Sequence, residues 1–249
     1  LHVFGYCYTY LNKLGEKRIM TTYTAVGKPV TRQEGPDKVS GNFQYAADVN
    51  LPGMIWGKVL RSPYPHAKIV NIDISRAAQL PGVYAIITGE DTKGMRVGRL
   101  IRDVPLLAED RVRFVGEKVA AVAAIDADTA EEALALIDVE YEPLPAVFDP
   151  VEAITPGSPL VHEGSPSFQA GSSSVEPQGN ILDLSTWSNG DLDQGFKESD
   201  FVFEHTFTTT WVHQGYMEPY ACVVNITDQD RIEVWANNKV PYTLRRQLS

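Results

Sequence analysis

Apolar and polar positions along the first 150 residues fall into short runs that predict β-strands. Runs of this length, rich in β-branched and aromatic residues and separated by Gly and Pro, are typical of strands joined by turns. The runs with this character are 53–61, 67–72, 83–88, 112–114, 118–125 and 138–141. We expect the runs at 112–114 and 118–125 to form a hairpin around Gly116.

Two helices are predicted between these strands. Asp73 can cap a short helix that runs through Gln79. Asp128 followed by Glu131 has the spacing of a capping box, which predicts a helix over 130–137. One face of this helix carries the apolar residues Ala130, Ala133, Leu134 and Ile137. Because strands and helices mix with little strict βαβ alternation, we predict an α+β fold rather than a doubly wound one.

The chain changes character after about residue 153. Pro, Gly, Ser and Glu dominate residues 154–180, which favours a linker and a domain boundary there. Beyond the linker, Asp191 is expected to cap a helix that ends near Lys197. Residues 201–208 alternate as a strand, and we expect His205, on its apolar face, to pack in a core. Two further strands and a final helix are predicted at 220–226, 231–236 and 242–247.

These patterns divide the chain into four parts. Residues 1–19 differ in composition from the rest of the chain, and Met20 resembles a natural start. We interpret residues 1–19 as an extraneous or disordered N-terminal arm, and the alternative is a native arm. Residues 20–153 form the first predicted domain and 154–180 the linker, and 181–249 are expected to be the truncated start of a second domain.

Composition and charge narrow the classes of function. The net charge of -10 argues against a nucleic-acid partner, because phosphate binding needs clustered Lys and Arg. The longest apolar run, Val119–Ile125, is too short for a membrane span, which needs about 20 residues. Cys7 and Cys222 cannot build a disulfide framework, so a reduced, cytoplasmic protein is favoured, with export on a partner's signal left open.

The residues that carry chemistry form no motif that identifies an activity by itself. None of the five histidines lies at metal-ligand spacing from another, so no protein metal site is predicted. The sequence contains no dinucleotide fingerprint, no phosphate loop and no serine elbow. Nothing in the spacing of the carboxylates pairs two of them for acid–base work. Patterning alone therefore leaves the function open.

Several segments, taken in order, resemble a known family. The segments in the first part are RQEGPDKVSG at 32–41, DVNLPG at 48–53, LRSPYPHAKI at 60–69, PGV at 81–83, VRFVGEKVA at 112–120, AEEAL at 130–134 and VEYEPLPAVFD at 139–149. In that order they resemble the a/b hammerhead domain of xanthine dehydrogenase/aldehyde oxidase-type large subunits. Gly190-Asp191, HQGYMEPYA at 213–221 and VWANNKVP at 234–241 resemble the opening of the first molybdenum-cofactor-binding domain of that family.

The resemblance implies a molybdenum hydroxylase. Members bind a molybdenum–molybdopterin cofactor, here expected in the cytosine dinucleotide form, and hydroxylate an aldehyde or N-heterocycle with water-derived oxygen. Because this chain has no iron–sulfur cysteines and no flavin motif, the [2Fe–2S] centres and FAD are expected on a small and a medium partner subunit. The catalytic glutamate and the glycine-rich cofactor loop of the family lie beyond Ser249, so we expect no catalytic residue in this chain and no activity from it alone.

The resemblance also singles out four site residues. Lys239 stands where the family has the glutamine that hydrogen-bonds the apical oxygen of molybdenum, and Asn238 precedes it. We hypothesise that both lie near that oxygen, and the alternative for Lys239 is a solvated surface residue. Glu218, with His213 five positions before it, falls in the family's H-x-x-x-x-E-P segment. We expect Glu218 to be a buried structural carboxylate near the site, and a direct catalytic role is the alternative.

Two other functions remain open at this point. One is a related reductase or a carbon-monoxide-oxidising chemistry on the same scaffold. The other is a non-catalytic module whose hammerhead domain assembles partner subunits.

Overall fold

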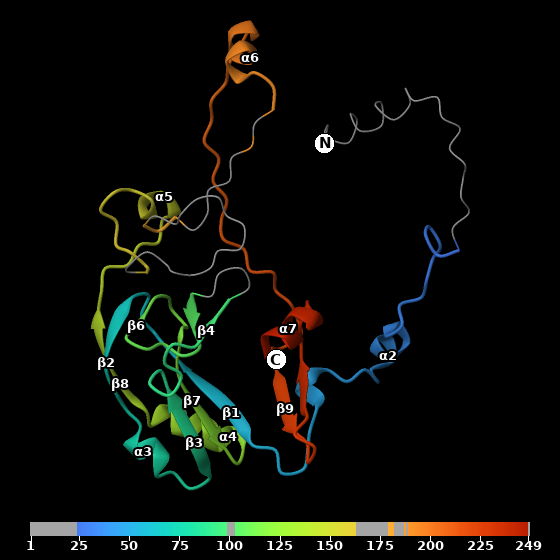
Figure 1. The fold of residues 1–249 in the computed structure, drawn as a ribbon, viewed down its shortest axis with the longest axis vertical. Coiled ribbons are helices and arrows are strands. Elements are labelled where there is room, and N and C mark those ends of the chain that lie inside the picture. Colours follow the sequence, from blue (N-terminus) through green and yellow to red (C-terminus); the bar gives the residue numbers. More distant parts are fainter. Residues whose placement is uncertain (1–23, 99–102, 163–178, 182–186, 188, 249) are drawn as a thin grey trace. The chain divides into compact units, whose positions relative to one another are not determined.

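The computed structural model describes residues 24–98, 103–162, 179–181, 187 and 189–248 (Figure 1). Residues 1–19 and most of the predicted linker therefore lie outside the described residues. The chain divides into two compact units, one of Asn50–Trp211 and one that joins Leu1–Val49 to Val212–Ser249. The predicted boundaries at 153 and 180 stay predictions.

Within its described residues, the Asn50–Trp211 unit contains two three-stranded sheets and a two-stranded ribbon. One sheet has the order β1-β7-β3, with β1 at Trp56–Arg61, β7 at Lys118–Ala124 and β3 at Val83–Thr88. The other has the order β6-β2-β8, with β6 at Arg111–Val112, β2 at Ala67–Asp73 and β8 at Asp138–Pro143. The ribbon pairs β4 (Arg96–Val97) with β5 (Val104–Pro105). All the pairings are antiparallel, which confirms the predicted α+β fold.

The predicted hairpin around Gly116 is wrong. β6 pairs with β2, whereas β7 pairs with β1 and β3, so the two strands belong to different sheets. The turn between them is held instead by the corner after β1. The Gly116 N–H donates to the Ser62 carbonyl at 2.8 Å, and the Ser62 N–H donates to the Glu117 carbonyl at 2.9 Å. These bonds to a distant part of the chain separate the two strands.

The helices of this unit are short, and three of the four described begin at an aspartate cap. They are α3 (Ser75–Ala78), α4 (Ala127–Ala135), α5 (Pro150–Ala153) and α6 (Leu192–Glu198). Asp73 accepts from the Ser75 N–H at 2.9 Å, and Asp191 caps α6 as predicted. The predicted capping box of α4 is wrong, because Asp126 accepts from the Thr129 N–H at 2.7 Å. Both Asp126 and Asp128 precede the apolar face, and the helix starts after the first of them.

Strand β7 supplies both halves of the core. Successive side chains of a strand point to opposite faces. Ala120, Val122 and Ala124 pack on one side, in a cluster with Ala77 of α3 and with Ala130, Ala133 and Ile137 from α4 and the turn after it. Val119 packs on the other side with Ala67, Ala108 and Val112. The apolar face predicted for the α4 segment is thus confirmed, and its alanines let the helix lie close to the sheet.

Gly89, directly after β3, marks a close approach of two backbone segments. A Cβ atom at this position would lie 2.1 Å from the Ala108 carbonyl oxygen. Only a residue without a side chain fits there, because the neighbouring atoms are backbone and cannot rotate away.

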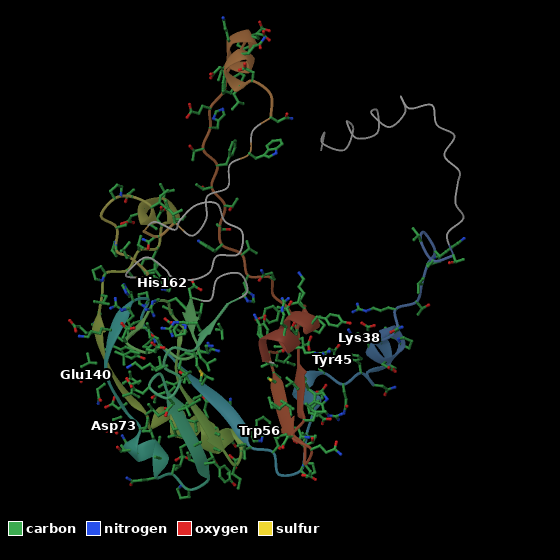
Figure 2. All side chains as sticks on the ribbon, in the orientation of Figure 1. Lys38, Tyr45, Trp56, Asp73, Glu140 and His162 are labelled. Carbon is green, nitrogen blue, oxygen red and sulfur yellow. The ribbon has the colours of Figure 1, made fainter. Side chains whose placement is uncertain are left out.

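The other unit has few elements. They are α2 (Gly35–Ser40), the 3₁₀ turn η1 (Ala46–Asp48), β9 (Cys222–Ile226), β10 (Ile232–Ala236) and α7 (Pro241–Leu248). The β9–β10 hairpin and the last helix confirm the sequence prediction. The Lys38 ammonium, labelled in Figure 2, lies 4.7 Å from the centroid of the Phe43 ring. None of the residues described in this unit is buried.

The strand predicted at 201–208 does not form in the structure. These residues belong to no helix or strand, and Phe201, Phe203 and Phe207 are at least 80% exposed. His205 is exposed as well, with its ring 6.2 Å from that of Phe207, so its predicted place in a core is wrong. A strand needs a neighbour for its backbone hydrogen bonds, and none of the described residues pairs with this segment.

Candidate functional site

The candidate site lies at the open end of the β9–β10 hairpin, opposite its turn. The ladder of the two strands ends at the pair Ala236 and Cys222. Beyond it, the Asn237 side-chain oxygen accepts from the Ala221 N–H at 3.2 Å. The Asn238 side-chain oxygen then accepts from the Val240 N–H at 2.6 Å, directly before α7 begins. Two asparagines therefore shape the connection between strand and helix, as their short side chains do in many turns.

This connection and the segment before β9 together line a pocket of about 300 Å³. The lining residues all carry polar groups: Tyr216, Glu218, Tyr220, Asn237, Asn238 and Lys239. Three of the four residues that the sequence singled out, Glu218, Asn238 and Lys239, thus lie on one pocket. A strand-to-helix loop is a place where functional groups are often presented.

Glu218 and Lys239 bring opposite charges to the pocket. Glu218 is half-buried and Lys239 is exposed. Within the described part of the chain, neither forms an ion pair within 4.0 Å, and no residue donates a hydrogen bond to the Glu218 carboxylate. The buried, hydrogen-bonded role predicted for Glu218 stays a prediction, and the structure leaves its carboxylate open to the pocket.

Two tyrosines complete the wall. The rings of Tyr216 and Tyr220 meet edge to face, with centroids 4.9 Å apart. Desolvation raises the pKa of the Tyr216 hydroxyl, and the hydrogen bond with Tyr220 raises it further. The Tyr216 phenol therefore keeps its proton near neutral pH and can donate to an oxygen atom in the pocket. The sequence did not single them out, although they lie in the segment 213–221 that carried the resemblance.

His213 does not line the pocket but supports it. Its Nδ1 accepts from the Gly215 N–H at 3.1 Å, and its ring lies 5.3 Å from that of Tyr216. Asn237 is the other residue that sequence reasoning missed. Its position in the segment 234–241 was the available signal, but its contact with Ala221 depends on how the hairpin pairs.

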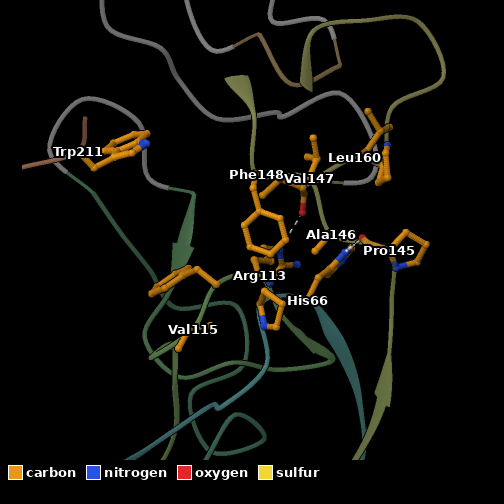
Figure 3. A pocket seen from close by; sticks show the side chains of 13 residues that line it. His66, Arg113, Val115, Pro145, Ala146, Val147, Phe148, Leu160 and Trp211 are labelled. Carbon is orange, nitrogen blue, oxygen red and sulfur yellow. Dashed lines mark hydrogen bonds between the residues drawn. The ribbon is translucent and has the colours of Figure 1, made fainter. Parts of the chain in front are cut away.

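A larger pocket, of about 530 Å³, lies in the Asn50–Trp211 unit and is mainly apolar (Figure 3). His66 and Arg113 are its polar side chains. Nδ1 of His66 lies 2.6 Å from the Pro145 carbonyl oxygen, and Nε of Arg113 donates to the Val161 carbonyl at 3.2 Å. Nδ1 of His66 and Nε of Arg113 are thus engaged with backbone, whereas Nε2 of His66 is buried and has no hydrogen-bond partner among the described residues.

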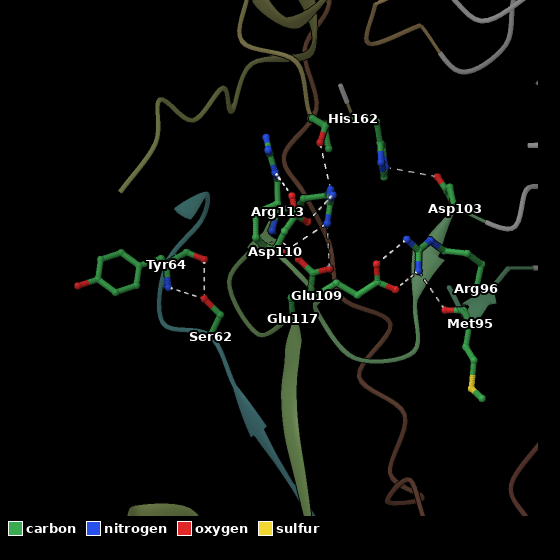
Figure 4. A network of polar contacts seen from close by, with 12 residues as sticks. Ser62, Tyr64, Met95, Arg96, Asp103, Glu109, Asp110, Arg113, Glu117 and His162 are labelled. Atoms are coloured by element: carbon green, nitrogen blue, oxygen red, sulfur yellow. Dashed lines mark hydrogen bonds and ion pairs between the residues drawn. The ribbon is translucent and has the colours of Figure 1, made fainter. Parts of the chain in front are cut away.

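A polar network beside that pocket is structural in character (Figure 4). Arg96 holds Glu109 with two hydrogen bonds, and this contact lowers the pKa of Glu109. Glu117, which is 2% exposed, accepts from the Arg113 N–H. Burial raises the pKa of Glu117 despite that bond, and burial lowers the pKa of His162. Each carboxylate here has a basic or backbone partner, which is typical of groups that fix a loop.

Two further observations concern metals and membranes. Among the described residues, no group of three or more His, Cys, Asp or Glu could hold a metal ion directly. The pocket beside Lys239 instead holds an ammonium, two amides and two phenols, which can donate hydrogen bonds to an oxygen-rich group, beside the Glu218 carboxylate, which only accepts. In the described part of the chain, no helix has the length and apolar character to cross a membrane.

Comparisons with known proteins define the class. Residues 40–145 match the family model described as aldehyde oxidase and xanthine dehydrogenase, a/b hammerhead domain, and residues 174–249 match the molybdopterin cofactor-binding domain. The chain belongs to the family of xanthine dehydrogenase/aldehyde oxidase-type large subunits. It comprises the hammerhead domain and the start of the molybdopterin-binding domain. The pocket beside Lys239 lies within the second of these matches.

Individual relatives agree with this assignment. The chain is 40% identical over 226 residues to a probable xanthine dehydrogenase subunit of Bacillus subtilis, covering 90% of this chain and 28% of the relative. It is 34% identical to the carbon monoxide dehydrogenase large chain of Afipia carboxidovorans, covering 84% of this chain and 27% of that one. The crystal structure of quinoline 2-oxidoreductase from Pseudomonas putida 86 is similar with a TM-score of 0.75 and 30% identity, covering 91% of this chain and 28% of that one. The chain spans about a quarter to a half of the length of the curated relatives that it matches.

Proposed function

We propose that the chain forms part of the large subunit of a molybdenum hydroxylase that hydroxylates an aldehyde or N-heterocycle with water-derived oxygen, and that it is inactive by itself. The observation that carries the proposal is the pocket that joins Glu218, Asn238 and Lys239 inside the segment matching the cofactor-binding domain. We further propose the cytosine dinucleotide form of the cofactor, iron–sulfur and FAD partner subunits, and a cytoplasmic location. The carbon monoxide dehydrogenase large chain and the 6-hydroxypseudooxynicotine dehydrogenase complex subunit among the relatives support a multi-subunit assembly.

The residues of the pocket have distinct roles in this proposal. When bound, the molybdenum–molybdopterin group supplies the oxidising chemistry. Lys239 and Asn238 would donate hydrogen bonds to its oxygen-rich face, and the Lys239 ammonium would stabilise negative charge that develops there. Preorganised donors of this kind are typically worth about 3 kcal/mol in the transition state. Glu218 would offset part of the charge of Lys239, because both residues line the same pocket.

The test is the Lys239→Gln substitution in the full-length, cofactor-loaded enzyme. The control is Lys197→Gln, because Lys197 is an exposed lysine at the end of α6. We expect kcat to fall in Lys239→Gln by less than the roughly 100-fold that the loss of a donor costs, because glutamine still donates a hydrogen bond and only the positive charge is removed. The control should be unchanged. The spectroscopic signal of molybdenum during turnover should change as well. If both are unchanged, Lys239 is an ordinary surface residue and its proposed role is wrong.

A second candidate is carbon monoxide oxidation on the same scaffold, which the similarity to the Afipia carboxidovorans chain favours. Dye reduction with carbon monoxide, compared with an aldehyde and an N-heterocycle, separates the two candidates. Activity with carbon monoxide alone would replace the first proposal.

A further inference from the structure

At the open end of the β9–β10 ladder, a side chain accepts the hydrogen bond that a backbone carbonyl would normally accept. The last backbone pair joins Ala236 to Cys222, so Asn237 and Ala221 would form the following pair. There, the Ala221 N–H is bound by the side chain of Asn237 at 3.2 Å instead. A side chain therefore extends the ladder by one bond and leaves the backbone of Asn237 free to turn away from the hairpin.

This side-chain hydrogen bond matters because it joins the two segments that form the walls of the pocket. The wall with Tyr216, Glu218 and Tyr220 precedes Ala221 and contains no helix or strand. The other wall is the loop with Lys239, whose backbone is also fixed by the bond from the Val240 N–H to Asn238. The contact between Asn237 and Ala221 is the hydrogen bond between these two walls in the described structure.

We propose that Asn237 is a positioning residue: its side chain clasps the segment before β9 to the loop after β10 and so holds Lys239 and Glu218 on one pocket. Asn237 acts through Lys239 and touches no reacting atom in this proposal. The clasp itself depends only on the geometry of the hairpin, whereas its consequence for turnover rests on the proposed function.

Three variants separate the hydrogen bond from the bulk of the side chain. Asn237→Asp keeps an oxygen that can accept from the Ala221 N–H, and Asn237→Leu has a similar size but no acceptor. Asn237→Ala removes the acceptor without added bulk and replaces the leucine variant if that one does not fold. The matched control is Asn225→Leu, which removes a 3.3 Å hydrogen bond from Asn225 to Glu233 in the same hairpin, away from the pocket.

The first readout is hydrogen exchange of the Ala221 amide, measured by NMR. Protection should fall at least ten-fold in Asn237→Leu or Asn237→Ala and stay close to the parent value in Asn237→Asp and Asn225→Leu. Unchanged protection in the variants without an acceptor would overturn the clasp.

The second readout is the amide bond that a carbodiimide forms between the Glu218 carboxylate and the Lys239 amine, quantified by peptide mass spectrometry. We expect it in the parent, in Asn237→Asp and in Asn225→Leu, and at least a ten-fold lower yield in Asn237→Leu and Asn237→Ala. Equal yields in all variants, or none in the parent, would contradict the proposal.

Neither readout needs the cofactor, so the two proposals fail separately. If both readouts behave as expected but Lys239→Gln leaves turnover unchanged, the clasp stands and the role of Lys239 at the cofactor falls. If turnover depends on Lys239 but the yield of the Glu218–Lys239 crosslink is the same in all Asn237 variants, only the positioning role of Asn237 is wrong.

Discussion

The two units of the chain contrast in where their polar and apolar groups lie. In Asn50–Trp211, alanines and valines from β7 and α4 are fully buried, and the polar side chains beside them pair with one another. In the unit with β9, β10 and α7, none of the described residues is buried, and a carboxylate and an ammonium face one pocket without an ion pair. The first arrangement stabilises a fold through many contacts, while the second presents groups whose positions depend on single hydrogen bonds.

The contrast predicts that the largest loss of stability follows from Gly89→Ala. Its new methyl group would meet the Ala108 carbonyl at 2.1 Å, so two backbone segments of the core must separate. Overpacking costs about 1–3 kcal/mol, and we expect the upper end here because the atoms that clash belong to the backbone. The measurement is the free energy of unfolding from a denaturant titration.

Gly57→Ala is the matched control for that substitution. Gly57 lies in β1, has no atom within 4 Å of its missing Cβ, and has an ordinary backbone conformation. Alanine there should be neutral or stabilise by about 0.5 kcal/mol, since it restricts the unfolded chain. Equal effects of the two alanines would mean that the close approach at Gly89 is not a constraint.

We expect a smaller loss of stability when one valine from each unit is replaced by alanine. Val122 in β7 is 2% exposed, and Val122→Ala should cost about 2 kcal/mol because it removes buried methyl groups and leaves a cavity. Val234 in β10 is only half-buried, so Val234→Ala should cost less than about 1 kcal/mol. Unfolding measured by tryptophan fluorescence and by circular dichroism checks both values. A cost at Val234 as large as at Val122 would show that the hairpin has a core of its own.

The same contrast explains what the sequence could predict. The strand at 83–88 was predicted with the bounds that β3 has, and the face of α4 was predicted residue by residue, because both depend on local periodicity. The partners of β6 and β7 could not be read from periodicity, since they depend on bonds between Ser62 and the turn at Gly116. The strand at 201–208 had the right alternation but lacks a partner among the described residues.

The candidate site also depends on contacts between distant positions, which local periodicity does not reveal. The resemblance to the family, and no physical pattern, pointed to Glu218, Asn238 and Lys239. The structure adds that they share a pocket, and it adds Tyr216, Tyr220 and Asn237. These three could not be identified from spacing, because a contact between positions 221 and 237 appears only when the hairpin pairs in register.

The smallest expected effect is a pH dependence of stability that comes from Glu117, in the polar network of the Asn50–Trp211 unit (Figure 4). Burial raises the pKa of Glu117 above the ordinary 4.5, so the folded protein holds this proton more tightly than the unfolded chain does. Its contribution to stability therefore declines as pH rises from 4.5 through the folded pKa. Glutamine at this position can still accept from the Arg113 N–H and does not titrate. Relative to the parent, Glu117→Gln should thus gain stability as pH rises from 4 to 7, in unfolding titrations at a series of pH values (about one unit apart).

Glu109 in the same network should respond with the opposite sign. The hydrogen bonds from Arg96 lower its pKa below the ordinary 4.5, so the ionised form stabilises the fold above 4.5 and this contribution is lost as pH falls through the folded pKa. Relative to the parent, Glu109→Gln should be less stable at neutral pH, and the gap should close on acidification. Because one carboxyl is governed by burial and the other by its arginine, two slopes of the same sign would contradict this account of the network.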